Sequence, residues 1–287
     1  MKVAVVGANG QLGADLVEIF SSGHDVTGLT HADIEITNID SVRKVLPSIK
    51  PDILINTAAY NKVPDAEINS AEAFQINAAG PLNLAKICTE ENIRFIQYST
   101  DYVFDGRKNS PYTEKNLPNP LNVYGNTKLS GEYFSLNYCD RSFVVRVSGI
   151  YGKIPSRSKG NNFITSILKA AKEKPEVKVV NDEVLTPTPT KWIAKNTLAL
   201  AQTEAYGLYH MSCDGAVSWY EFAKTIWDEL KIKTPLHPSS VNDFPQNVKR
   251  PFYSVLENHN LKSLGIDQMP DWKKALVEFL KENKNYF

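Results

Sequence analysis

The pattern of hydrophobic residues alternates between two kinds of segment along the first half of the chain. Short runs of aliphatic and β-branched residues, typical of buried parallel strands, cover residues 2–6, 25–29, 52–56, 94–98 and 142–146. Segments with helical spacing lie between them, for example residues 12–20 and 71–90. Strands separated by helices of this length predict right-handed crossovers within one doubly wound parallel sheet, a Rossmann-type α/β fold.

The alternation of strand-like and helix-like segments changes after residue 152, which predicts a second and smaller domain. A polar stretch over residues 153–161 precedes a helical pattern at 163–172, a strand at 177–181 and the turn-rich segment 186–190. A helical pattern at 192–203 and a strand pattern at 207–211 then indicate that the chain returns to the first sheet. We therefore expect a Rossmann domain from residues 1–152 and 190–212, and a discontinuous α+β domain from residues 153–189 and 213–287.

The composition is that of an ordinary globular protein, with 42% hydrophobic and 22% charged residues. Because 32 basic residues balance 32 acidic residues, we expect neither nucleic acid nor an anionic membrane as a partner. Three cysteines without a CxxC pair argue against a disulfide framework or a zinc cluster and favour a reducing compartment. No apolar run reaches the roughly 18 residues that a membrane span requires. We therefore expect a cytoplasmic protein.

Three glycines, Gly7, Gly10 and Gly13, follow the first predicted strand and open the first predicted helix. Glycine allows a tight turn and a close backbone approach, and a helix N-terminus presents unpaired N–H groups to an anion. The spacing GxxGxxG differs from the common GxGxxG fingerprint, and a plain tight turn is the alternative interpretation. The position between a strand and a helix favours a turn that holds the pyrophosphate of a dinucleotide.

Thr30 and His31 stand at the end of the second predicted strand, where NAD-binding proteins usually carry a carboxylate for the ribose 2′-hydroxyl. The lack of an acid at these two positions favours NADP(H), because a carboxylate would repel its 2′-phosphate. Asp33 lies close enough in the sequence to leave NAD(H) open.

Tyr124 and Lys128 are four residues apart, which places them on one face of a helix. We expect the ammonium to lower the pKa of the phenol, so that Tyr124 exchanges a proton with an alcohol or ketone near neutral pH. A second pair with this spacing, Tyr220 and Lys224, lies in an amphipathic segment and is interpreted as structural. Tyr124 is preferred because it follows residues 99–101 at the end of a predicted strand, where open α/β sheets place catalytic groups.

Several longer motifs are more specific than these short patterns. They are Gly-Ala-Asn-Gly-Gln-Leu-Gly at 7–13, Asn-Thr-Ala-Ala-Tyr at 56–60, Tyr-Ser-Thr-Asp-Tyr-Val-Phe-Asp-Gly at 98–106, Pro-Leu-Asn-Val-Tyr-Gly-Asn-Thr-Lys at 120–128, Gly-Asn-Asn-Phe at 160–163, Asn-Asp at 181–182 and Arg-Pro at 250–251. Through them the chain resembles, over nearly its whole length, the extended short-chain dehydrogenase/reductases and, within these, the dTDP-4-dehydrorhamnose reductases.

The resemblance implies an oxidoreductase that reduces the C4 ketone of a dTDP-4-dehydro-6-deoxy sugar, dTDP-4-dehydro-L-rhamnose, for polysaccharide synthesis. It implies NADPH as the hydride donor, with NADH also open, a first domain that binds NADP(H), a second that binds the nucleotide-diphosphate sugar, and a homodimer. In the implied mechanism Thr100 hydrogen-bonds the substrate carbonyl and Tyr124 donates the proton. Lys128 tunes Tyr124 and holds the nicotinamide ribose.

The implied binding residues fall into two groups. With His31 from the strand-end pattern, the cofactor residues are Gly7, Gly10, Gln11, Leu12, Gly13, Thr30, His31, Glu35, Ile36, Tyr124, Lys128 and, expected along the fourth strand, Ala58, Ala59 and Tyr60. The substrate residues are Thr100, Asp101, Asn162 and Arg250. Asn162 and Arg250 are candidates for the diphosphate because turns and arginine forks suit phosphate oxygens. For Arg250, an ordinary salt bridge is an equal alternative.

The chain also departs from the family pattern. Gly149 stands where these reductases usually carry a tryptophan against the sugar, and we expect this to leave that wall empty and the exact sugar open. The family's magnesium-binding carboxylates do not all match, since Lys191 stands near where one acid is expected. We therefore expect no metal.

Two alternatives to a reductase remain. An epimerase or dehydratase of the same fold returns the hydride, holds its cofactor tightly and shows no net oxidation of added NADPH. A regulatory subunit of methionine adenosyltransferase is a relative that keeps cofactor binding without catalysis. The set of Thr100, Tyr124 and Lys128 argues against the second alternative, whereas Gly149 leaves it open.

Overall fold

The computed structural model describes residues 1–155, 160–244 and 248–284, and its central element is a six-stranded sheet. The strand order is β10 (Gly207–His210), β5 (Ser142–Val147), β4 (Arg94–Thr100), β3 (Ile53–Asn56), β1 (Lys2–Val6) and β2 (Asp25–Leu29). All neighbouring strands in it run parallel. The predicted α/β fold is confirmed, including the late return of the chain to this sheet.

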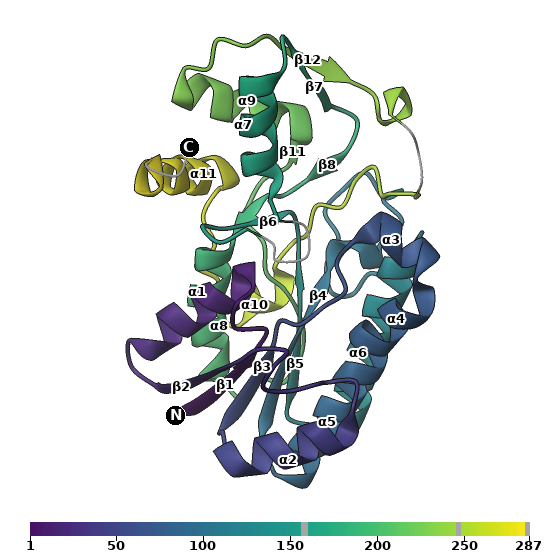
Figure 1. The fold of residues 1–287 in the computed structure, drawn as a ribbon, viewed down its shortest axis with the longest axis vertical. Helices are drawn as coiled ribbons and strands as arrows, with labels where there is room; N and C mark the ends of the chain where they lie inside the picture. The colour runs from purple at the N-terminus through teal and green to yellow at the C-terminus, as the bar shows by residue number, and fades with distance from the viewer. Residues whose placement is uncertain (156–159, 245–247, 285–287) are drawn as a thin grey trace.

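The side chains of the sheet alternate between two hydrophobic cores. Along β1, Val3 and Val5 pack into one core, and Ala4 and Val6 pack into the other. The first face is covered by α1 (Gln11–Ser21) and α8 (Thr190–Ala201), and the second by α2 (Ile39–Ile49) and α5 (Gly80–Glu90) (Figure 1). Burial on both faces explains why the central strands β1 and β3 are each hydrophobic over consecutive residues.

The segment predicted as a single helix over residues 71–90 contains a π-helical turn. In chain order the pieces are α4 (Ser70–Phe74), the π turn (Gln75–Ala79) and α5, and the short helix α3 (Val63–Ile68) precedes them. Asn77 in the π turn donates from Nδ2 to Thr127 Oγ1 of α6 (Val123–Tyr138) and to the Tyr60 carbonyl, both at 2.9 Å. The turn therefore fixes the loop after β3 against α6.

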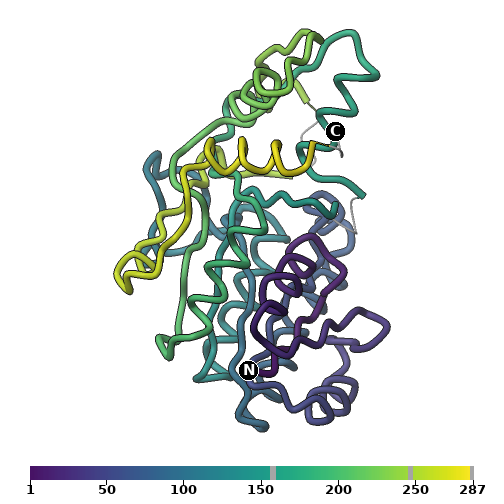
Figure 2. The backbone as a smooth tube through the Cα atoms, turned by 90° about the vertical axis from the view of Figure 1, so that its left-hand side faces the viewer, coloured from purple at the N-terminus to yellow at the C-terminus, as the bar shows by residue number. Residues whose placement is uncertain are grey.

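A second group of elements lies beyond the carboxyl ends of the sheet (Figures 1 and 2). It contains α7 (Phe163–Glu173), β7 (Val177–Val180), β8 (Val184–Leu185), β11 (Val217–Ser218), α9 (Trp219–Leu230), β12 (Leu236–Ser239), a 3₁₀ turn (Val241–Asp243) and α11 (Trp272–Glu282). Ile164, Phe222 and Leu276 share its core although they are distant in sequence. The short strands β6 (Ile150–Tyr151) and β9 (Thr188–Pro189) pair where the chain passes between the two groups.

The boundaries of the two predicted domains stay a prediction. Leu261 of α10 (His259–Ser263) and Met269 lie in the first core, although both belong to the segment assigned to the second domain. Of the predicted polar stretch 153–161, residues 156–159 lie outside the described residues.

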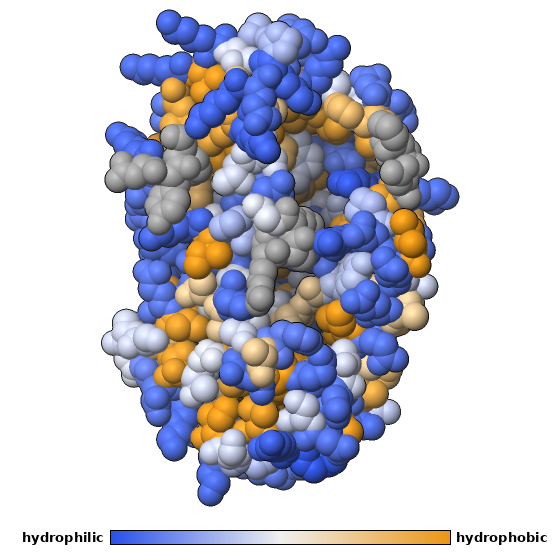
Figure 3. Space-filling view, viewed as in Figure 1, coloured by the Kyte–Doolittle hydropathy of each residue, from blue (hydrophilic) through white to orange (hydrophobic). Residues whose placement is uncertain are grey.

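Hydrophilic side chains are spread over the whole face shown in Figure 3, with small hydrophobic patches between them. Within the described ranges, every helix is too short or too polar to cross a membrane.

A buried ion pair joins α6 to the sheet. Arg146 of β5 donates from Nη2 and Nε to the two carboxylate oxygens of Glu132, at 2.6 and 2.8 Å. The Arg146 and Glu132 side chains are only 3% and 2% exposed. A buried charge without a partner is unfavourable, because it has lost its hydration and gains no ion pair in exchange. The pair therefore holds α6 in one position on the sheet.

We predict that Glu132→Ala lowers the free energy of unfolding by about 3–5 kcal/mol, because it leaves a buried guanidinium unpaired. Glu90→Ala is the control, since Glu90 pairs at 3.4 Å with Arg43 and both side chains are about half exposed. Its loss is expected to stay below about 1 kcal/mol. Urea unfolding at pH 7 measures both values, and equally small losses would contradict the structural role of the buried pair.

Candidate active site

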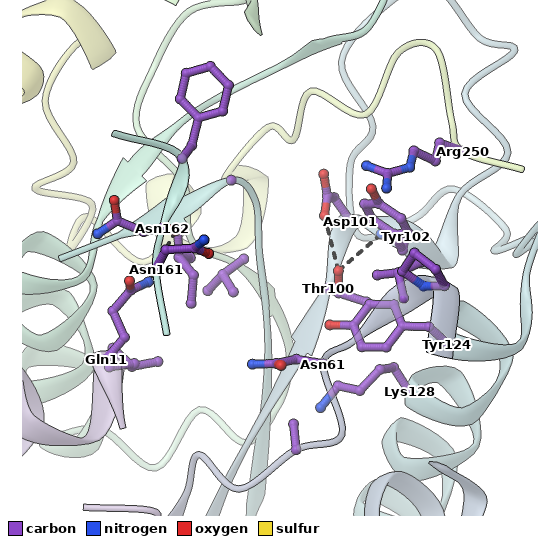
Figure 4. A pocket seen from close by; sticks show the side chains of 18 of the residues that line it. Gln11, Asn61, Thr100, Asp101, Tyr102, Tyr124, Lys128, Asn161, Asn162 and Arg250 are labelled. Carbon is purple, nitrogen blue, oxygen red and sulfur yellow. Dashed lines mark hydrogen bonds between the residues drawn. The ribbon is translucent and has the colours of Figure 1, made fainter. Parts of the chain in front are cut away.

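A cleft of about 1820 Å³ lies between the carboxyl ends of the strands and the second group of elements. Figure 4 shows Gln11, Asn161 and Asn162 on one side of this cleft, and Thr100, Asp101 and Tyr124 on the other. The chain leaves β1 at a topological switch point, because β2 and β3 flank it on opposite sides. Open α/β sheets bind their ligands at such a crevice.

Two positions in and next to the turn between β1 and α1 require glycine. Gly7 has φ +78°, and a Cβ there would lie 2.6 Å from Thr57 Oγ1. A Cβ on Gly13 would collide with the Gly7 carbonyl oxygen. Gly10 donates its N–H to that same carbonyl at 2.9 Å, and no side chain caps α1. The turn therefore brings an uncapped helix N-terminus to the cleft, which suits an anion.

Gln11 supplies a further polar group at this end of the cleft. Its amide nitrogen donates to the Ile150 carbonyl at 3.1 Å, whereas its Oε1 is buried and has no hydrogen-bond partner among the described residues. Gly7, Gly10, Gln11 and Leu12 line the cleft, and Gly13 supports the turn from behind. A bare backbone cradle beside an unpaired acceptor fits a pyrophosphate and the ribose hydroxyls next to it.

Of the two acidic residues near the end of β2, Glu35 lines the cleft and Asp33 does not. Asp33 accepts from Thr30 N at 2.8 Å and from Thr30 Oγ1 at 2.7 Å, and these hydrogen bonds lower its pKa. Neither Thr30 nor Asp33 lines the cleft, whereas His31, Glu35 and Ile36 do. Glu35 Oε2 lies 3.3 Å from His31 Nδ1, so the carboxylate at this end is that of Glu35.

The expectation that Ala58, Ala59 and Tyr60 lie along the fourth strand is wrong. They follow β3, because Asn56 ends that strand by accepting the Ala58 N–H at 3.1 Å on its side chain, a local turn that competes with strand pairing. Ala58 and Ala59 line the cleft. Tyr60 does not, since its hydroxyl contacts Asn69 Nδ2 at 3.4 Å.

The structure brings Thr100, Tyr124 and Lys128 to one wall of the cleft (Figure 4). Thr100 is the last residue of β4, and Tyr124 lies in the first turn of α6, which begins where the Asn122 side chain accepts the Gly125 N–H at 2.8 Å. Lys128 follows one turn later and donates from Nζ to the Tyr98 carbonyl at 2.7 Å. The end of one strand and the start of one helix therefore position all three groups.

The expectation that Tyr124 has a pKa near neutral pH is wrong. Burial and the nearby Asp101 together raise the pKa of Tyr124 to about 12, and the hydrogen bond with Thr100 opposes this rise. Burial also lowers the pKa of Lys128 to about 8, although Glu132 acts in the opposite direction. Loss of water outweighs local charge here, so the phenol keeps its proton at neutral pH.

Asp101 connects Thr100 to two other parts of the chain. Its carboxylate is 3% exposed and accepts from Thr100 Oγ1 at 3.0 Å, Ser148 Oγ at 2.9 Å and Ser254 Oγ at 2.6 Å. Burial raises the pKa of Asp101, and the three hydroxyl donors oppose that rise. Because the Thr100 proton is directed at Asp101, a contact from Thr100 to a substrate carbonyl stays a prediction.

The two candidates for the diphosphate have different surroundings. Asn162 caps α7 by accepting the Thr165 N–H at 3.0 Å, and it donates to the Gly152 carbonyl at 3.0 Å, so both ends of its amide are engaged. Arg250 lines the cleft (Figure 4) and forms no ion pair with any described residue. The salt-bridge alternative for Arg250 therefore finds no partner in the described part of the chain.

The lining residues that were missed in the sequence include Tyr102, Glu183 and Trp219. Burial raises the pKa of Glu183, and the positive charge of Arg250 opposes this rise. Tyr102 stands inside the strand-end motif, which was the available signal, and its ring packs edge-on against Tyr124. Glu183 directly follows the Asn-Asp motif at 181–182.

The expectation that Gly149 leaves its wall empty is also wrong. Gly149 has φ +52°, and a Cβ there would lie 2.8 Å from Leu185 Cδ1. Leu185 therefore occupies the space in front of this glycine. The absence of a metal stays a prediction.

Comparison with known proteins agrees with this geometry. The family model described as the RmlD substrate binding domain matches residues 1–285. The spore coat polysaccharide biosynthesis protein SpsK of Bacillus subtilis is 34% identical over 99% of this chain and 98% of its own length. The dTDP-4-dehydrorhamnose reductase of Aggregatibacter actinomycetemcomitans is 34% identical over 96% of this chain and 97% of its own.

A crystal structure of the dTDP-4-dehydrorhamnose reductase of Bacillus anthracis in complex with NADP is 37% identical. It superposes with a TM-score of 0.94 over 98% of this chain and 99% of that chain. The chain therefore belongs to the family of the dTDP-4-dehydrorhamnose reductases, within the extended short-chain dehydrogenase/reductases.

Proposed function

We propose that this protein reduces the C4 ketone of a dTDP-4-dehydro-6-deoxy sugar, dTDP-4-dehydro-L-rhamnose, with NADPH. The observation that carries the proposal is that the glycine cradle and the set of Thr100, Tyr124 and Lys128 line one cleft. The NADP complex of the Bacillus anthracis relative supports the choice of cofactor. The name of the SpsK relative supports a role in polysaccharide synthesis, and the resemblance supports a cytoplasmic homodimer.

When bound, NADPH supplies a hydride to the carbonyl carbon. Tyr124 is protonated at neutral pH because burial raises its pKa to about 12. An alkoxide is a stronger base than a phenolate, so the proton passes from the Tyr124 hydroxyl to the developing alkoxide oxygen. Lys128, held by the Tyr98 carbonyl, supplies the positive charge that stabilises the phenolate left behind.

We propose that the nucleotide diphosphate binds near Arg250, whose guanidinium faces the cleft without a carboxylate partner among the described residues. Bidentate hydrogen bonds from arginine suit phosphate oxygens. Asn162 contributes by fixing the start of α7, since its amide is already engaged. Asp101 fixes the orientation of Thr100 next to the reacting carbonyl.

Tyr124→Phe is predicted to lower kcat by about 10²- to 10⁴-fold, because it removes the proton donor alone. The KM for NADPH is expected to change little. Tyr220→Phe is the control, since Tyr220 has the same spacing to a lysine but packs against the core of the second group of elements. NADPH absorbance with dTDP-4-dehydrorhamnose generated in situ follows the reaction, and equal rates in the wild type and Tyr124→Phe would refute the assignment. Wild type that oxidises no NADPH with this sugar would favour an epimerase, a dehydratase or a non-catalytic subunit.

The activity is predicted to fall at alkaline pH. Lys128 carries its proton below a pKa of about 8 and loses it as the pH rises through that value. We therefore expect kcat/KM, which reports ionisations of the free enzyme, to decline above about pH 8. Lys128→Arg keeps a charge at this pH, and its profile is expected to be flat to about pH 10, although at a lower rate. A wild-type profile that stays flat to pH 10 would count against the role of Lys128.

Gly7→Ala is predicted to weaken NADPH binding at least about tenfold, because a methyl group there needs a left-handed backbone and pushes Thr57 into the cradle. Gly23→Ala is the control, since nothing lies within 4 Å of its added Cβ. Quenching of protein fluorescence measures both affinities, and the melting temperature shows whether each variant is folded. Unchanged affinity in a folded Gly7→Ala would place the dinucleotide elsewhere. The same titration with NADH tests the cofactor preference.

A further inference from the structure

The cleft lining beside the reacting groups contains both apolar and polar side chains. Val147 of β5 is the register partner of Thr100 on β4, so it stands directly next to the catalytic wall. Val147, Gly149, Ile150 and Leu185 all line the cleft. The polar lining residues include Thr100, Asp101, Tyr102, Glu183 and Arg250.

Among the apolar lining residues, Leu185 occupies the space in front of Gly149. Its Cδ1 lies 2.8 Å from where a Cβ of Gly149 would stand, and Pro187 Cα lies 3.1 Å from the same point. Strand β8 is fixed on both edges. Leu185 pairs with Val217 of β11, Val184 N donates to the Phe252 carbonyl at 2.7 Å, and Ser254 N donates to the Val184 carbonyl at 2.8 Å. The position of the Leu185 side chain is therefore built into the fold.

We propose that Leu185 is a specificity-determining residue that contacts the C5 methyl group of the 4-keto-6-deoxy sugar. This inference rests on the proposed function. The methyl group is the one apolar substituent of such a sugar, and it is attached to the carbon next to the reacting C4. With the ketone at Tyr124 and Thr100, the methyl group contacts the apolar side chains of Val147 and Leu185. The hydroxyl groups of the sugar contact the polar lining residues.

The same apolar side chains disfavour binding of a sugar that carries a hydroxymethyl group at C5. The extra hydroxyl would lose its water against Leu185 and Val147, whose side chains offer no hydrogen bond. Rejection of an added hydroxyl by an apolar pocket is limited to about 100-fold. These side chains therefore make the enzyme prefer 6-deoxy sugars without excluding the others absolutely.

Two inhibitors that share the C5 configuration of the substrate and differ by one oxygen test this inference: dTDP-L-rhamnose and dTDP-L-mannose. Their inhibition constants are measured against NADPH oxidation with dTDP-4-dehydrorhamnose. In the wild type we expect the 6-deoxy compound to bind about 10- to 100-fold more tightly. Leu185→Asn is expected to bring the two constants within about threefold, because an amide can hydrogen-bond the additional hydroxyl. Leu185→Met, which keeps an apolar side chain, is expected to retain the preference.

Leu117→Asn is the matched control, because Leu117 is 89% exposed and lies outside the cleft lining. Melting temperatures show whether each variant is folded. If Leu185→Asn misfolds, Leu185→Ala replaces it, and the preference is then expected to fall at least threefold through loss of contact with the methyl group. Normal turnover with an unchanged preference in the Leu185 variants overturns the inference alone. A wild type that oxidises no NADPH overturns the proposed function, and this inference with it.

Discussion

Burial of Tyr124 and Lys128 in one cleft is the constraint on which the chemistry of this protein depends. Removing water from a phenol favours its protonated form, and removing water from an ammonium favours its neutral form. The first effect raises the pKa of Tyr124 to about 12, and the second lowers the pKa of Lys128 to about 8. At neutral pH the cleft therefore holds a proton donor beside a positive charge.

The fold keeps this arrangement through contacts made behind the reacting groups. The Asp101 carboxylate accepts hydrogen bonds from the hydroxyl groups of Thr100, of Ser148 directly after β5 and of Ser254. Glu132 and Arg146 fasten α6, which carries Tyr124 and Lys128, to the sheet. Displacement of either the second group of elements or α6 would therefore change the positions of Thr100, Tyr124 and Lys128.

The sequence was sufficient for features that depend on local pattern. The hydrophobic runs predicted the parallel strands, and the spacing of Tyr124 and Lys128 after the strand-end motif predicted a catalytic pair. That Thr100 joins this pair was implied by the family resemblance. Features that depend on distant contacts were missed. Leu185 fills the space at Gly149 from another strand, and the Asn56 side chain places Ala58 in a loop. The pKa of Tyr124 was predicted in the wrong direction because nearest-neighbour charge was considered and burial was not.

The ionisation state of Tyr124 is the most direct test of this account. Tyrosine labelled with ¹³C at Cζ reports ionisation of each phenol by NMR, and the signal missing in Tyr124→Phe identifies Tyr124. We expect this signal to keep the chemical shift of a neutral phenol from pH 6 to pH 10. A Tyr124 signal that titrates near neutral pH would show that the neighbouring charge outweighs burial, and it would contradict the account.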